Sequence, residues 1–94
     1  MDNALKEVLH EWESAFDNRG MKVSIVKGPM PRSYTAEVDG ENFVGNITFW
    51  PEGQFEFQFN RCSSGEVVML ETKEFHSVQE LSNFVGDLLT KKLN

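Results

Sequence analysis

A strict alternation of apolar and polar residues over positions 43–60 constrains the fold of this chain more than any other feature of its sequence. A period of two is typical of a half-buried β-strand, so the segment predicts a hairpin with one face in the core and the other in water. A three-residue loop over 51–53, with Gly53 at a positive φ, pairs Phe49 with Phe55. A slip of one residue would turn half of the apolar side chains into solvent, so the register is well determined.

A second hairpin is predicted at Asp39-Gly40, which follows a strand over residues 33–38. This dipeptide is a strong signal for a two-residue turn. The turn would place Tyr34 opposite Gly45, where the ring covers the backbone that a mid-strand glycine leaves bare. Both hairpins therefore put Gly45 on the core face.

The last strand is expected over about residues 66–73. If Arg61 pairs with Glu66, the phenylalanines of the preceding strand face Val68, Leu70 and Thr72. The other register would turn Glu71 toward the core, so we favour the first.

Two amphipathic helices flank the strands. Apolar residues recur at helical spacing over 3–18, before a stop at Gly20, and again after Ser77, where Glu80 completes a capping box. A short strand is predicted over 21–27. The order α-β-β-β-β-β-α predicts a two-layer α+β sandwich, an antiparallel meander of about five strands with the N-terminal and C-terminal helices on one face. We expect a single domain over residues 1–94.

Composition narrows the class of partner. The chain carries 9 Lys and Arg against 15 Asp and Glu, a formal net charge of −6. An acidic surface repels nucleic acid and anionic lipid and favours a basic protein partner, although solubility alone also accounts for a mildly acidic charge. With one cysteine, no visible secretory signal and no apolar run near the ~18 residues of a membrane span, we expect a cytoplasmic protein without a disulfide.

No arrangement of residues typical of catalysis is visible. His10 fits a solvated helix face and His76 fits a helix start, and neither has the spacing of a zinc site. Cys62 lies in a Ser/Gly turn without a recognisable base, which favours an inert exposed thiol. We therefore predict no catalytic residue, no metal and no cofactor, and a protein that is not an enzyme.

The polar face of the predicted sheet is the leading candidate for a binding surface. In the favoured register Glu56 lies opposite Glu71, a like-charge pair that is mildly destabilising by itself. Either Lys73 on the diagonal relieves this repulsion, or the two carboxylates receive a cation from a partner. Trp50 adds apolar surface among amides, as interfaces do, unless it folds against Pro51. We expect the partner-binding residues to be Trp50, Glu56, Gln58, Met69, Glu71, Glu37, Asn46 and Thr48.

Three stretches give the chain a family resemblance. They are 45–53 (Gly-Asn-Ile-Thr-Phe-Trp-Pro-Glu-Gly), 64–67 (Ser-Gly-Glu-Val) and 74–81 (Glu-Phe-His-Ser-Val-Gln-Glu-Leu). Together with the alternating strand they resemble the TriTu-type immunity proteins of bacterial polymorphic toxin systems, which are encoded next to Rhs-repeat toxins delivered by type VI secretion. The resemblance implies that the protein neutralises a cognate toxin domain, an ADP-ribosyltransferase that modifies elongation factor Tu. The implied complex is tight and one-to-one, covers the toxin's active site, and needs no cofactor.

Two further alternatives remain open from the sequence. A small acidic secretion chaperone that binds an extended effector segment has a similar size, charge and fold class, but such proteins usually dimerise. The binding surface of an immunity protein could also be the acidic side of the first helix, which carries Glu7, Glu11 and Asp17.

Overall fold

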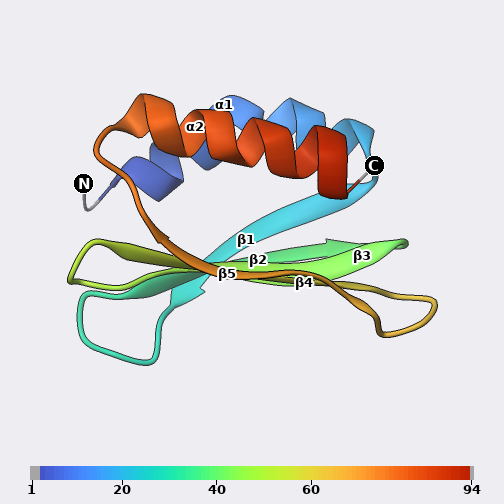
Figure 1. Cartoon of the computed structure of the whole chain (residues 1–94), viewed down its shortest axis with the longest axis horizontal. Helices are drawn as coiled ribbons and strands as arrows, with labels where there is room; N and C mark the ends of the chain where they lie inside the picture. Colours follow the sequence, from blue (N-terminus) through green and yellow to red (C-terminus); the bar gives the residue numbers. More distant parts are fainter. Residues whose placement is uncertain (1–2, 94) are drawn as a thin grey trace.

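The computed structural model describes residues 3–93 and has the predicted order of elements (Figure 1). The elements are α1 (Ala4–Asn18), β1 (Met21–Lys27), β2 (Tyr34–Gly40), β3 (Phe43–Phe49), β4 (Gln54–Arg61), β5 (Val67–Glu74), α2 (Val78–Asp87) and a short π-helical segment, η1 (Leu88–Lys92). The single-domain prediction also included Met1, Asp2 and Asn94, which lie outside the described residues.

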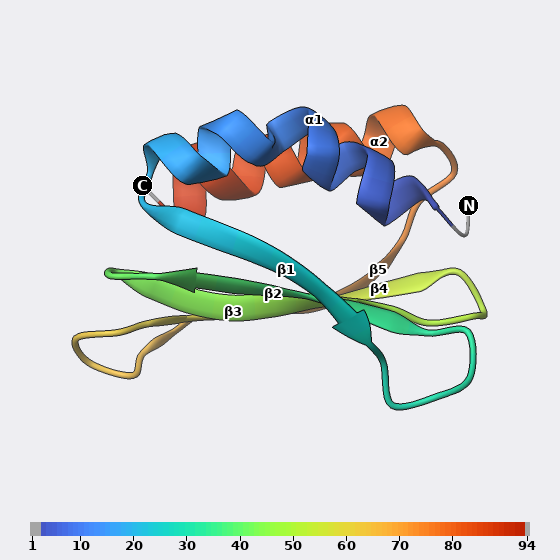
Figure 2. The same ribbon diagram turned by 180° about the vertical axis from the view of Figure 1, so that it is seen from behind.

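The strands form one antiparallel sheet in the order β1-β2-β3-β4-β5, so each strand pairs with its neighbour in the sequence. Both long helices lie side by side over one face of this sheet, and the views from the two sides agree (Figure 1, Figure 2). The predicted two-layer α+β sandwich is confirmed. No helix of residues 3–93 covers the second face of the sheet, and we call this face the open face.

The core lies between the sheet and the helices. Phe55, Phe57 and Phe59 are fully buried, as the alternation along β4 predicts. The ring of Phe84 from α2 lies 4.7 Å from that of Phe57, centroid to centroid, and Phe75 packs against Phe55 at 5.6 Å. Full burial of a side chain of this size contributes about 1.5–3 kcal/mol, so the apolar half of the hairpin anchors the helix layer.

Two hydrogen bonds and one close approach join the two helices. The indole nitrogen of Trp12 donates to the hydroxyl of Ser82, which donates to the carboxylate of Glu11. A Cβ at Gly86 would lie 2.8 Å from the Trp12 ring, so a larger residue there would displace the indole. The helix ends follow the sequence signals: Gly20 has a positive φ of 74°, and the backbone N–H of Glu80 donates to the Ser77 side chain.

The register of the hairpin between β3 and β4 is confirmed. Phe49 pairs with Phe55, and Gly45 pairs with Phe59. The loop closes with the Trp50 N–H donating to the carbonyl of Gln54 at 2.9 Å. Strict alternation over two adjacent strands thus determined both the pairing and the two faces.

The predicted turn between β2 and β3 lies two residues too early, so the partner of each β2 residue is wrong by four residues. Asp39 pairs with Val44, Gly45 lies opposite Val38, and the turn lies at residues 41–42. Tyr34 therefore faces Phe49, with ring centroids 5.3 Å apart, instead of Gly45.

The later turn keeps Asp39 and Gly40 in β2, where they pair with Lys22 and Met21 of β1. Met21 packs so closely there that a Cβ at Gly40 would lie 2.6 Å from its side chain. The longer strands also form more ladder hydrogen bonds than the early turn would allow. Because each pairing differs from the predicted one by an even number of residues, Gly45 stays on the predicted core face.

The predicted register of β5 is correct at its start and wrong beyond it. The Arg61 N–H donates to the Glu66 carbonyl at 2.8 Å, and Asn60 pairs with Val67. The register then shifts at a β-bulge between Phe59 and Asn60, and the remaining pairs are Phe59 with Met69, Phe57 with Glu71 and Phe55 with Lys73. Val68, Leu70 and Thr72 are therefore not the residues opposite the phenylalanines.

The bulge is explained by the side chains that it places on the helix side of the sheet. Met69 turns into the core, where it is 7% exposed. Glu71 and Lys73 turn to the helix side, but at the sheet edge, where their side chains remain partly in water and lie 3.7 Å apart as an ion pair. The Lys73 ammonium also lies 5.3 Å from the centre of the Phe84 ring. An edge strand tolerates inward charges that a central strand would not.

Candidate functional site

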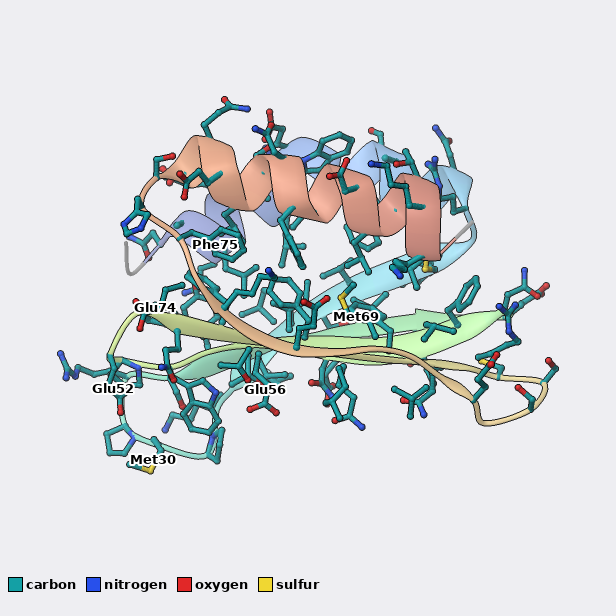
Figure 3. All side chains as sticks on the ribbon, viewed as in Figure 1. Met30, Glu52, Glu56, Met69, Glu74 and Phe75 are labelled. Atoms are coloured by element: carbon teal, nitrogen blue, oxygen red, sulfur yellow. The ribbon has the colours of Figure 1, made fainter. Side chains whose placement is uncertain are left out.

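The open face is a polar surface built from alternate residues of all five strands. In Figure 3 the side chain of Glu56 points away from the helices, on the open face, whereas that of Met69 points toward the helices. The register arranges its side chains in three rows across the sheet. From β1 to β5, these rows are Lys22–Asp39–Val44–Asn60–Val67, Ser24–Glu37–Asn46–Gln58–Leu70 and Val26–Thr35–Thr48–Glu56–Thr72.

Most of the predicted site residues lie on this face. Glu37, Asn46, Thr48, Glu56 and Gln58 are in its rows, and Trp50, which follows β3, lies by alternation on the same side. Thr48 is buried, and its hydroxyl lies 3.0 Å from that of Thr35. Thr48 therefore supports the surface more than it offers contact area.

Two predicted site residues do not belong to the open face. Met69 is buried in the core, and Glu71 lies on the helix side in its ion pair with Lys73. The predicted pair of carboxylates, Glu56 opposite Glu71, does not exist, because Glu56 pairs with Thr72. Lys73 is correspondingly the partner of Glu71, and the idea that it relieves Glu56 is wrong.

The open face carries an excess of negative charge without internal partners. Its strands contribute the carboxylates of Glu37, Asp39, Glu56 and Glu74 against the single ammonium of Lys22. Within residues 3–93, none of these four carboxylates forms an ion pair or a side-chain hydrogen bond. Like charges on one surface that are not neutralised internally attract a partner of opposite charge.

A shallow depression of about 340 Å³ lies on the open face. Its lining includes Glu37, Asp39 and Val44, together with the amide side chains of Asn46, Gln58 and Asn60. Asn60 donates to the Gly65 carbonyl at 3.1 Å, whereas Asn46 and Gln58 make no side-chain hydrogen bond in the described part of the chain. The depression therefore offers both acceptors and donors to a partner.

Sequence reasoning missed one apolar residue of this face. The predicted pairing of Arg61 with Glu66 already turns Val67 outward, and the bulge turns Leu70 outward as well; the two side chains are 52% and 64% exposed. Residues 67–70 are apolar without interruption, so alternation there does not distinguish one register from the other. The alternative register, which turns Glu71 toward the core, would have placed Leu70 on the open face.

The residues considered for catalysis are dispersed in the structure. Cys62 is exposed, with its sulfur 3.6 Å from the Gly40 carbonyl oxygen. His10 lies on α1 beside β1, and His76 lies in the connection before α2. Within residues 3–93, no group of three or more His, Cys, Asp and Glu side chains is arranged to hold a metal ion.

Comparison with known proteins assigns the family. The family described as immunity protein TriTu matches residues 3–91. The chain belongs to the TriTu immunity protein family. Comparison with curated proteins finds no match.

The TriTu match extends beyond the three stretches that carry the resemblance in the sequence. It includes α1 and all five strands, and therefore the whole open face. TriTu proteins are immunity proteins, so membership points to neutralisation of a toxin and to a toxin protein as the partner. No helix of residues 3–93 is long and apolar enough to cross a membrane.

Proposed function

We propose that this TriTu protein binds a cognate antibacterial toxin domain and neutralises it in a one-to-one complex that covers the toxin's active site. The observation that carries the proposal is the family match over residues 3–91. Inhibition by occlusion needs a tight stoichiometric complex and neither turnover nor a cofactor, so the protein acts as a binding partner, not as an enzyme. The toxin in this proposal is an ADP-ribosyltransferase domain of a Rhs protein delivered by type VI secretion, and it is met in the cytoplasm.

The proposed interface is the open face. Its unpaired carboxylates favour a basic surface on the toxin, in keeping with the net charge of −6. The amides around the depression can exchange hydrogen bonds with either backbone or side chains of a partner. The predicted residues that share this face are proposed to contact the toxin: Trp50, Glu56, Gln58, Glu37 and Asn46. Thr48 is buried and supports the surface beneath them.

The acidic side of α1 is a weaker candidate for the same role. The carboxylate of Glu11 accepts a hydrogen bond from Ser82 at 2.7 Å, so a partner would have to compete with a contact that joins the helices. Glu7 and Asp17 remain exposed, but they are separated along α1 by nearly three turns. On the open face Glu37 and Asp39 lie two residues apart on one strand, roughly 7 Å from each other.

Co-purification tests the proposal directly. The tagged protein is co-expressed with the toxin domain encoded beside its gene, and the eluate is analysed by mass and the culture by growth. A one-to-one complex together with restored growth is the expected result. Growth arrest with no complex would overturn the proposal.

The same experiment separates the chaperone alternative. A secretion chaperone would elute as a homodimer that holds an extended effector segment and would not depend on a folded toxin domain. Mixing the purified, folded toxin with the purified TriTu protein distinguishes the two, because only an inhibitor then abolishes transfer of ADP-ribose from NAD.

A further inference from the structure

Two rows of the open face are acidic at β2 and aliphatic at β5. In these neighbouring rows the carboxylates stand on β2, the amides on β4 and the aliphatic side chains on β5, whereas β3 contributes Asn46 to one row and Val44 to the other. Adjacent strands lie about 4.8 Å apart, so roughly 14 Å separates the acidic end from the aliphatic end. The residues at the acidic end are Asp39 and Glu37, and those at the aliphatic end are Val67 and Leu70.

Both ends lack a partner within the described part of the chain. Glu37 and Asp39 form neither an ion pair nor a side-chain hydrogen bond there. No large apolar side chain of residues 3–93 is more exposed than Leu70, at 64%, and Val67 lies beside it on the same strand. Single exposed aliphatic residues are ordinary, but two adjacent ones beside a polar depression are typical of an interface.

We propose that these two rows form a docking site with two ends for one basic element of the cognate toxin. A cationic side chain of that element pairs with Glu37 and Asp39, and an apolar side chain of the same element covers Val67 and Leu70. The depression between the ends is lined by Asn46, Gln58 and Asn60. It receives the polar groups of the toxin element that lie between its cationic and its apolar side chain. This inference rests on the proposed function and adds to it the chemistry of the toxin surface.

Charge decides which occupant fits. A second copy of this chain would bring a second set of unpaired carboxylates into the interface, and each copy carries a net charge of −6. Like charges brought together at an interface are unfavourable, so self-association through this face is opposed. A basic toxin surface avoids that repulsion and supplies cationic partners for the carboxylates of Glu37 and Asp39.

The test compares two variants of the docking site with two matched controls, all in the full-length protein. Leu70→Ser removes the apolar end and Glu37→Gln the charge at the acidic end. The controls are Val78→Ser, an apolar residue at the start of α2 that is 40% exposed, and Glu13→Gln, an exposed acid on α1. Titration calorimetry with the purified toxin domain, at low and at high salt, gives the dissociation constants.

We expect Leu70→Ser and Glu37→Gln each to weaken binding by about tenfold, and the controls to stay within about twofold of the unmodified protein. Only Glu37→Gln should reduce the salt dependence of the dissociation constant, because only it removes a charge from the interface. All four side chains are exposed, and circular dichroism checks that each variant is folded.

The outcomes separate this inference from the proposed function. If the unmodified protein binds the toxin and neither Leu70→Ser nor Glu37→Gln changes the affinity beyond the controls, the docking site is wrong and the immunity function stands. If the unmodified protein does not bind or inhibit the toxin, the proposed function itself fails. A homodimer of the unmodified protein that Leu70→Ser converts to a monomer would assign the surface to self-association and overturn the inference.

Discussion

The indole nitrogen of Trp12 donates to the hydroxyl of Ser82 at 3.0 Å, and these two residues lie 70 positions apart in the chain. The same hydroxyl donates to Glu11 at 2.7 Å, so one buried serine satisfies two groups of α1. The contact connects the first helix of the chain to the last and makes the helix layer a unit. It also accounts for a serine among the otherwise apolar residues of the buried side of α2.

Replacement of Ser82 by alanine should therefore destabilise the protein. The substitution leaves the half-buried indole N–H without an acceptor, and we expect the free energy of unfolding to fall by about 1–3 kcal/mol. Urea denaturation measures this change. Ser14→Ala, on the exposed side of α1, is the matched control and should change stability by less than about 0.5 kcal/mol. Equal effects of the two substitutions would mean that the hydrogen bond contributes nothing.

Gly45→Ala should be much more disruptive than its small size suggests. The added methyl group would overlap the backbone carbonyl oxygen of Gln58 and the ring of Phe59, and neither can move without opening the hairpin. We expect a loss of about 3 kcal/mol, measured as a decrease in the thermal midpoint. Gly53→Ala provides the comparison, because space is open there and only the positive φ of 95° opposes a side chain. Its expected cost is about 1 kcal/mol.

The β-bulge predicts opposite results for neighbouring residues of β5. Met69→Ala removes a buried core side chain and should lower the free energy of unfolding by about 2–5 kcal/mol. Leu70→Ala removes a side chain that is mostly in water and should change it by less than about 0.5 kcal/mol. Chemical denaturation of the two variants decides between the registers, since a regular ladder without the bulge reverses the order.

Charge reversal should separate Glu56 from Glu71 in toxin binding. Glu56→Lys places a cation on the open face and should weaken the complex by about 2 kcal/mol or more if the partner surface is basic. Glu71→Lys changes the chain's charge equally but on the helix side, where it breaks the exposed pair with Lys73 at a cost below about 1 kcal/mol of stability. Surface plasmon resonance with immobilised toxin gives both affinities. Equal weakening by both variants would show that only net charge matters and would remove Glu56 from the interface.

The sequence predicted the elements wherever its pattern was strict. Alternation over 43–60 determined the central hairpin because a shift by one residue would have exposed three phenylalanines. The N-cap at Ser77 and the stop at Gly20 are local signals, and both are confirmed. The reciprocal bond of the predicted capping box is displaced by one residue, because the Glu80 carboxylate accepts from the N–H of His76 and not of Ser77. The fold class followed from the number of apolar faces that had to be buried against one another.

The errors came from places where local chemistry and tertiary packing disagree. Asp39-Gly40 is a good turn dipeptide, but the side chain of Met21 occupies the space next to Gly40, and no local pattern contains that contact. At 67–70 an unbroken apolar run left two registers open, and the choice depended on whether Met69 or Leu70 filled the core. The candidate site inherited this second error: the observed register removes Met69 and Glu71 from the face and adds Leu70.

The strict alternation of β3 and β4 has a consequence for how such a protein can change over evolutionary time. Each residue that holds the core has neighbours in the sequence that point to the opposite layer, so single codon changes alter the outward side chain and leave the inward one in place. If the surface of the toxin changes during evolution, substitutions at open-face positions such as Asn46 or Gln58 can restore the proposed contact without renewed selection for folding. New partner specificities are then reachable one mutation at a time, through intermediates that all fold.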